Sequence, residues 1–153
     1  ANKLKNLNFD IYGGNEKEIV LKKKISSKNI FFHGHIPHNK VKNVLVKTDI
    51  ALMPYQKKVS SVGQKDIAKW MSPLKMFEYM SYNTAIISSE HIVLKEILNS
   101  KNSFIVNSFH EDHWVRKIKY ILKNKIAAKK KANRAFKDSI KYTWPNRARI
   151  ILK

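Results

Sequence analysis

The sequence contains no cysteine, which excludes disulfide bonds, thiolate nucleophiles and cysteine-ligated metal sites. It contains no apolar run near the roughly 18 residues that a membrane-spanning helix needs, and its first 20 residues lack the charged-then-apolar layout of a secretion signal. We therefore expect a soluble domain of a reducing compartment, the cytoplasm. The chain starts with Ala1 rather than Met and soon enters a strand-like run, so we expect a piece of a longer protein.

Glycine is scarce, with four among 153 residues, and the motifs that depend on it are incomplete. Gly13 and Gly14 are only a fragment of the dinucleotide fingerprint, and the nucleophile-elbow and P-loop patterns are absent. By itself such a pair is more often a turn than a phosphate-binding loop. His33, His35 and His38 cluster near a strand end, but no acidic pattern and no cysteine accompany them. We therefore expect neither a metal ion nor another cofactor.

Acidic residues are also few: 11 Asp and Glu stand against 31 Lys and Arg, a formal charge of +20. Such an excess favours an anionic partner. However, 27 of the basic residues are Lys and four are Arg, whereas nucleic-acid recognition relies on the planar fork of Arg. A drift of the composition toward Lys, Asn and Ile explains part of the charge equally well. The Lys-rich segment 125–141 fits a helix packed on a sheet, with a basic outer face and an apolar stripe formed by Ile126, Ala132, Phe136 and Ile140.

The chain alternates between strand-like and helix-like segments. Strand patterns cover 7–12, 29–34, 49–53, 84–89 and 103–107, and helix patterns cover 16–25, 37–46, 72–83, 91–99, 110–141 and 144–152. This order predicts an α/β fold with a Rossmann-like open parallel sheet flanked by helices. Segment 54–71 interrupts the alternation, and loops beyond about 12 to 15 residues are usually functional or disordered. No repeat or linker is visible, so we expect a single domain over 1–153.

Ser72 and Pro73 form a strong helix start, because Ser is a favoured N-cap and Pro suits the first helical position. The next free amides belong to Leu74 and Lys75, and together with the helix dipole and the Lys75 ammonium they form an anion site. Glu78 lies on the same face one turn further, where its carboxylate can accept hydrogen bonds from sugar or ribose hydroxyls. Ligands of open α/β sheets bind beyond the carboxyl ends of the strands, so this segment is the main candidate.

Two simpler interpretations of this helix stay open. Lys75 and Glu78 can form an ordinary surface ion pair worth ~0.2 to 0.5 kcal/mol. The apolar residues of the helix are more simply members of the core than ligand contacts, and they are Leu74, Met76, Phe77 and Met80.

The run SPLKMFEYMSYNTAIISS at 72–89 resembles the donor-binding stretch of family 4 (group 1) glycosyltransferases, especially bacterial members with a Ser-Pro-Leu-Lys-x-Phe-Glu-Tyr-Met form. Segments 29–55, 95–98 and 141–152 resemble further segments of the family in the same order, so the resemblance covers nearly the whole chain. It implies the C-terminal, nucleotide-sugar-binding domain of a two-domain enzyme with the GT-B fold. In the family, this domain starts with a further strand and helix that carry a basic pair, and this pair neutralises the diphosphate. By the resemblance, these elements and the acceptor domain would precede Ala1. The fragment alone should not catalyse transfer.

The resemblance also implies roles for single residues. In the family, amides at the start of the central helix contact the phosphates or sugar of the donor, and a Glu inside the helix holds the ribose. By position, the helix starts at Ser72. The contacts to the phosphates or sugar are then expected from Pro73, Leu74 and Lys75, and the contact to the ribose is expected from Glu78.

Two turns complete the expected donor site. By the resemblance, Gly13 and Gly14 would lie close to the phosphates, since Gly allows a close approach of the backbone. The turn after the second strand would wall the nucleobase, mostly through backbone groups, and it consists of His33, Gly34, His35 and Ile36.

The function implied is retaining transfer of a hexose from a UDP- or GDP-sugar to a glycan or lipid-linked acceptor bound by the missing N-terminal domain, in polysaccharide biosynthesis. The nucleotide sugar is a substrate, and no metal is expected. The expected location is the cytoplasm, at the inner face of the cytoplasmic membrane, whose anionic surface attracts nearby Lys or Arg by ~1 kcal/mol each. The alternative is a basic Rossmann-like binding module for polyanions, nucleic acid or anionic membrane, without turnover. No nucleic-acid reader motif is present, so nucleic acid is not the expected partner.

Overall fold

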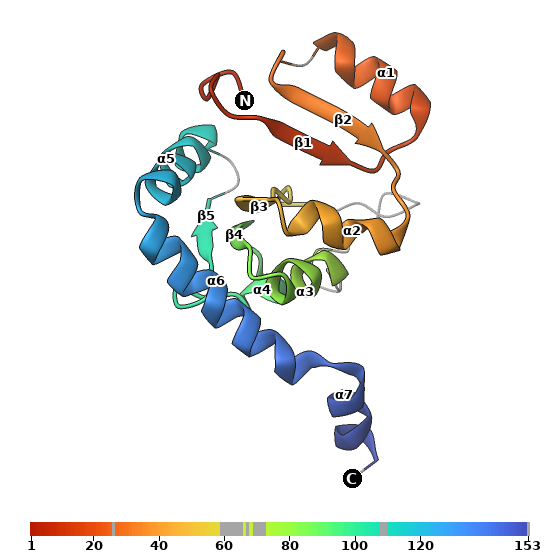
Figure 1. Cartoon of the computed structure of the whole chain (residues 1–153), viewed down its shortest axis with the longest axis vertical. Helices are drawn as coiled ribbons and strands as arrows, with labels where there is room; N and C mark the ends of the chain where they lie inside the picture. The colour runs from red at the N-terminus through yellow and green to blue at the C-terminus, as the bar shows by residue number, and fades with distance from the viewer. Residues whose placement is uncertain (26, 59–65, 67, 69–72, 108–109, 153) are drawn as a thin grey trace. The chain divides into compact units, whose positions relative to one another are not determined.

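Figure 1 shows a computed structural model of the chain, which describes residues 1–25, 27–58, 66, 68, 73–107 and 110–152. The chain divides into two compact units, Ala1–Val44 and Leu45–Lys153. Each unit contains parallel strands accompanied by helices, which confirms the predicted α/β, Rossmann-like fold class.

The first unit is built on a parallel strand–helix–strand motif. Strand β1 (Phe9–Tyr12) pairs in parallel with β2 (Ile30–Gly34), and helix α1 (Glu16–Ile25) connects them. A capping box starts α1: the Asn15 side chain accepts a hydrogen bond from the Glu18 amide at 2.9 Å, and the Glu18 carboxylate accepts one from the Asn15 amide at 3.4 Å. Local sequence thus fixes where α1 begins, directly after the glycines that end β1.

The second unit contains a three-stranded parallel sheet in the order β3-β4-β5. Helix α2 (His38–Leu45) lies at the end of the first unit, and the strands of the second unit are β3 (Ile50–Met53), β4 (Ala85–Ser89) and β5 (Phe104–Val106). Its helices are α3 (Leu74–Ser81), α4 (Ile92–Lys95), α5 (Glu111–Lys123), α6 (Lys125–Ser139), a 3-10 turn (Ile140–Tyr142) and α7 (Trp144–Ile151). The central strand β4 is buried at every residue, including Ser88 and Ser89 at its end, which confirms the buried strand predicted over 84–89. Helices α3 and α6 contact each other and β4, whereas α5 packs on β5.

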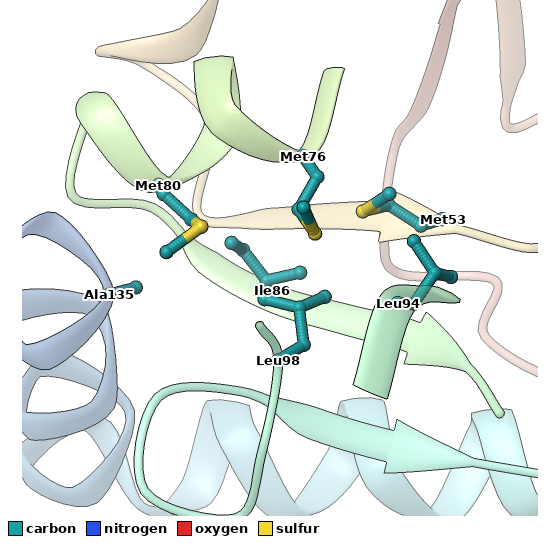
Figure 2. Close-up of a cluster of buried hydrophobic side chains, with 7 residues drawn as sticks. All are labelled: Met53, Met76, Met80, Ile86, Leu94, Leu98 and Ala135. Atoms are coloured by element: carbon teal, nitrogen blue, oxygen red, sulfur yellow. The ribbon is translucent and has the colours of Figure 1, made fainter. Parts of the chain in front are cut away.

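A core rich in methionine holds α3 against the sheet. Its buried members are Met53, Met76, Met80, Ile86, Leu94, Leu98 and Ala135. Figure 2 shows Met76 and Met80 pointing from α3 toward Ile86 on β4. Met76 and Met80 are four residues apart and therefore share one face of the helix. Their burial fixes the rotation of α3 about its axis, and with it the direction of every other side chain on the helix.

The apolar stripe predicted for the Lys-rich helix is wrong in all but one residue. Ile126 is 89% exposed, and Ile140 and Phe136 are exposed as well. The buried residues of α6 are Ala128, Ala132 and Ala135. These small side chains let α6 approach α3 and β4 closely, so the larger apolar side chains face away from the sheet.

Several smaller expectations also change. The helix predicted over 91–99 is confined to Ile92–Lys95 and gives way to a turn. Leu74, predicted for the core, is 67% exposed, because the Met76 and Met80 face of α3 is the one that packs. The sequence predicted one open sheet, whereas the described strands form two sheets, one of β1 and β2 and one of β3, β4 and β5. Most of the predicted loop 54–71 lies outside the described residues.

Candidate functional site

Helix α3 begins at Leu74, one residue later than predicted, and Pro73 precedes it as the cap residue. With ψ at 89°, Pro73 is outside the helical region, and its carbonyl accepts a hydrogen bond from the Met76 amide at 2.9 Å. Ser72, the predicted N-cap, lies outside the described residues. The first amides of an α-helix have no partner within the helix. The amides of Leu74 and Lys75 therefore stand at the positive end of α3, where an anion binds favourably.

Lys75 and Glu78 are carried by the same first two turns of α3. Lys75 is exposed and Glu78 is partly buried. The backbone at Glu78 is well fixed, because its carbonyl accepts hydrogen bonds from the Ser81 hydroxyl at 2.8 Å and from the Tyr82 amide at 3.3 Å. The structure thus brings the four described residues predicted for the helix, Pro73, Leu74, Lys75 and Glu78, into one short stretch at the start of α3.

Two tyrosines that the sequence motifs did not indicate are Tyr79, which follows Glu78, and Tyr55, which lies near Tyr79. Burial raises the pKa of the Tyr79 phenol, and the neighbouring Tyr55 and the charge of Glu78 raise it further. Burial also raises the pKa of the Tyr55 phenol. Both phenols therefore stay protonated at neutral pH and can donate hydrogen bonds. Tyr79 directly follows Glu78 in the sequence, and this adjacency was the signal that could have found it.

The carboxyl ends of β3 and β4 are joined by a polar contact. The Ser89 hydroxyl lies 2.7 Å from the Tyr55 carbonyl and 3.2 Å from the Met53 carbonyl. Next to it, the His91 ring packs edge-on against the Tyr55 ring at 6.2 Å between centroids. Among the described residues, His91 Nε2 is the buried side-chain polar atom that lacks a hydrogen-bond partner. This edge of the second unit is therefore polar beneath its surface, which no sequence motif had indicated.

The glycines predicted for the donor site lie at the ends of β1 and β2. Gly13, Gly14 and Gly34 have φ of 103°, 83° and 71°, a region that favours glycine. The Gly13 amide donates a hydrogen bond to the Gly34 carbonyl at 2.6 Å, which joins the two turns. A Cβ atom added at Gly13 would meet nothing within 4 Å, so the backbone is open there to an approaching group. Ile36 follows β2 and is partly buried.

A cluster that the sequence analysis did not predict lies beside these turns. Asp10 Oδ1 is 2.5 Å from His33 Nε2, and the Tyr12 ring stacks on the His33 ring at 4.5 Å with 12° between the planes. The cluster arises because β1 and β2 are parallel neighbours, a pairing that spacing along the chain does not reveal. Within the described ranges, no group of three or more His, Asp or Glu is placed to hold a metal ion. None of the helices described is long and apolar enough to cross a bilayer.

Solved glycosyltransferase structures share this fold. S. aureus TarM is 17% identical with a TM-score of 0.66 over 92% of this chain and 27% of its own chain. Anabaena HepE, solved in complex with UDP, is 10% identical with a TM-score of 0.68 over 90% of this chain and 38% of its own. The C-terminal domain of LpcC, a group 1 family protein from Francisella tularensis, is 20% identical with a TM-score of 0.61 over 84% and 62% of the two chains. This chain thus spans less than two thirds of each of these three chains.

No curated protein sequence matches this chain. The sequence profile of the family described as glycosyl transferase-like, however, matches residues 1–153. This match confirms the resemblance that the segment SPLKMFEYM first indicated. The chain therefore belongs to the glycosyl transferase-like family.

Proposed function

We propose that this chain is the donor-binding part of a glycosyltransferase and binds a nucleotide sugar as its substrate. The observation that carries the proposal is the packing of α3. Burial of Met76 and Met80 holds the helix on the sheet and leaves Lys75 exposed and Glu78 partly exposed beside the first free amides. Membership of the family and the common fold with HepE, which was solved with UDP, support it.

Each group in this stretch has a chemical role. The amides of Leu74 and Lys75, the helix dipole and the Lys75 ammonium bind the diphosphate, and they stabilise its growing charge as the nucleoside diphosphate leaves. The Glu78 carboxylate accepts hydrogen bonds from the ribose hydroxyls, and such charge-assisted bonds are about twice as strong as neutral ones. For the turns at Gly13–Gly14 and Gly34 in the first unit, the family resemblance is what supports a role in binding the nucleotide. Binding of the diphosphate and binding of the ribose by these groups do not require a metal ion.

The finer function rests on the family resemblance. We propose that a hexose of a UDP- or GDP-sugar is transferred with retention of configuration to a glycan or lipid-linked acceptor, in polysaccharide biosynthesis. Residues 1–153 act as a single donor-binding domain. A basic module that binds polyanions without turnover is the second candidate, because the chain carries a formal charge of +20.

Calorimetric titration of the protein in its full natural length with UDP, GDP and a short DNA duplex distinguishes the two candidates. We expect UDP or GDP to bind more tightly than DNA. In Lys75→Ala, nucleotide affinity should fall about fivefold and depend less on salt, because one exposed charge contact is lost. Lys23→Ala, a matched exposed lysine on α1, should leave it unchanged. DNA binding that is tighter than nucleotide binding and insensitive to Lys75→Ala would instead favour the polyanion module.

We also propose that the protein works in the cytoplasm, where the outer face of α6 meets the anionic inner surface of the membrane. Lys129, Lys130 and Lys137 on this helix are exposed. Replacing all three with Gln should weaken binding to phosphatidylcholine vesicles containing 30% phosphatidylglycerol by about 100-fold, since each Lys near such a surface contributes ~1 kcal/mol. The same replacement of Lys17, Lys23 and Lys24 on α1 is the charge-matched control. If the unmodified protein binds pure phosphatidylcholine vesicles as tightly as vesicles that contain phosphatidylglycerol, the proposal is contradicted.

A further inference from the structure

We propose that an open pocket between β5 and α5 binds a phosphate group. Helix α5 packs on β5 (Figure 1), and the pocket beside them has a volume of about 390 Å³. Pockets of about 300 to 1,000 Å³ bind small molecules, so a phosphate that carries a small organic group fits this space. The pocket lies within the second unit, and the described residues that line it do not include those assigned to the donor nucleotide. A ligand here is therefore additional to the nucleotide sugar.

One face of α5 forms a basic wall of the pocket. Its residues follow each other at intervals of three and four or less, which places them on one side of the helix, and they are His113, Arg116, Lys117 and Tyr120. The neighbouring face of α5 is buried through Ile118 and Ile121, and this packing fixes the direction of the basic face. An Arg guanidinium pairs with two phosphate oxygens at once, a Lys ammonium adds a point charge, and a His ring donates from at least one nitrogen. This set of groups suits a phosphate.

The cations of this face have no acidic partner in the part of the chain that the structure describes. Arg116 is exposed and Lys117 is partly buried, and neither forms an ion pair there. Arg134 on α6, by contrast, is paired with Asp138 at 3.1 Å. The positive charge in the pocket is therefore open to an anion from outside the chain.

A further positive charge lies close to Lys117. The ammonium groups of Lys117 and Lys131 lie 6.0 and 4.7 Å from the centre of the same Phe104 ring. The Lys131 ammonium is held there, since it donates a hydrogen bond to the Ser103 carbonyl at 3.1 Å. Burial lowers the pKa of Lys131, and the charge of Lys117 lowers it further. The two like charges repel each other, and a phosphate bound at Lys117 offsets this repulsion.

The outer edge of β5 adds a backbone donor. β5 is the last strand of the sheet β3-β4-β5, and its Val106 carbonyl accepts a hydrogen bond from the Glu90 amide, which follows β4, at 3.0 Å. Successive residues of a strand turn their amides to opposite edges, so the Ile105 amide points away from β4. Ile105 lines the pocket and is partly exposed. Its amide is therefore a further hydrogen-bond donor for a bound phosphate.

Titration of the full-length protein with glycerol 3-phosphate, followed by nuclear magnetic resonance, tests the pocket. Saturating UDP is present, so that the proposed donor site at α3 is occupied. The Arg116 Nε–H and His113 ring resonances should shift as the ligand binds. Arg116→Gln combined with Lys117→Gln should weaken binding by about 10- to 30-fold, since each lost contact between exposed charges costs up to about fivefold. Arg116→Lys, which keeps the charge but loses the planar fork, should give a smaller loss.

The matched control combines Lys119→Gln with Lys123→Gln. It removes the same charge from exposed positions of α5 outside the pocket and should leave the affinity within about twofold. The phosphate group can belong to a soluble molecule or to a lipid headgroup, and phosphatidylcholine vesicles with phosphatidic acid present the second form. A loss confined to glycerol 3-phosphate identifies a soluble ligand, and a loss confined to the vesicles identifies a headgroup. A loss in both assays identifies a pocket that takes either form.

Equal affinities of the two double variants in both assays would overturn the pocket, because binding would then reflect total charge. Absence of binding by the unmodified protein in both assays would overturn it as well. Neither result changes the account of the nucleotide site, because none of the substituted residues is assigned to it. If UDP itself fails to bind, the proposed function fails, and the comparison of the two double variants still tests the pocket.

Discussion

Glu78→Gln is expected to weaken binding of UDP by about 10- to 100-fold, because hydrogen bonds to a charged group contribute ~1.5 to 3 kcal/mol and, in the proposed site, the neutral amide replaces the carboxylate that binds the ribose. The substitution preserves size, and Glu78 is only partly buried, so the fold should persist. Calorimetric titration of the full-length protein gives the affinity, and circular dichroism checks that the variant keeps the secondary structure of the unmodified protein.

A matched substitution separates this effect from a general loss of negative charge. Glu16 is an exposed carboxylate in the first turn of α1, and Glu16→Gln should leave the affinity for UDP unchanged. If both variants lose affinity equally, or if neither does, Glu78 does not hold the ribose. The assignment of α3 as the donor helix would then lose its main support.

Met80→Ala is expected to lower the free energy of unfolding by ~2 to 5 kcal/mol, since it empties a site in a packed core. Met80 is fully buried where α3 and α6 meet the sheet, beside Ile86 and Ala135 (Figure 2). Chemical denaturation followed by circular dichroism measures the loss. Because Met80 also anchors the helix that carries Glu78, the remaining folded protein should bind UDP more weakly.

The control for Met80→Ala is a large apolar residue that the sequence pattern had also placed in a packed stripe. Ile126 is 89% exposed on α6, so Ile126→Ala should change the free energy of unfolding by at most ~0.5 kcal/mol. Comparable losses in the two variants would mean that α6 packs through its large residues and not through its alanines. The description of the core would then be wrong.

Strand and helix order was predictable from the sequence because hydrophobic periodicity is a local property. The runs at Ile50–Met53 and Ala85–Ser89 form the expected buried strands, and α3 lies where Pro73 and the following apolar residues placed it. The exact start of α3 differed by one residue because a proline can precede a helix as well as begin it. Its ψ angle, which decides between the two, depends on residues around it.

Packing partners were less predictable because they depend on which elements meet in space. The small residues of α6 pack, although Ile126 is far more hydrophobic than Ala128, because close approach to α3 and β4 requires short side chains. For the same reason the pattern could name Glu78 and Lys75 on one helix but could not find Asp10 beside His33. That contact depends on the parallel pairing of β1 with β2 and on the extra residue at His33.

The central claim is that the Glu78 carboxylate binds the ribose hydroxyls of the donor nucleotide. A double-mutant cycle tests it most directly: calorimetric titration of the unmodified protein and of Glu78→Gln with UDP and with 2′,3′-dideoxy-UDP. We predict that Glu78→Gln weakens UDP by about 10- to 100-fold but leaves dideoxy-UDP almost unaffected, a coupling energy of ~1.5 to 3 kcal/mol. The same loss for both nucleotides would give no coupling and would contradict the claim.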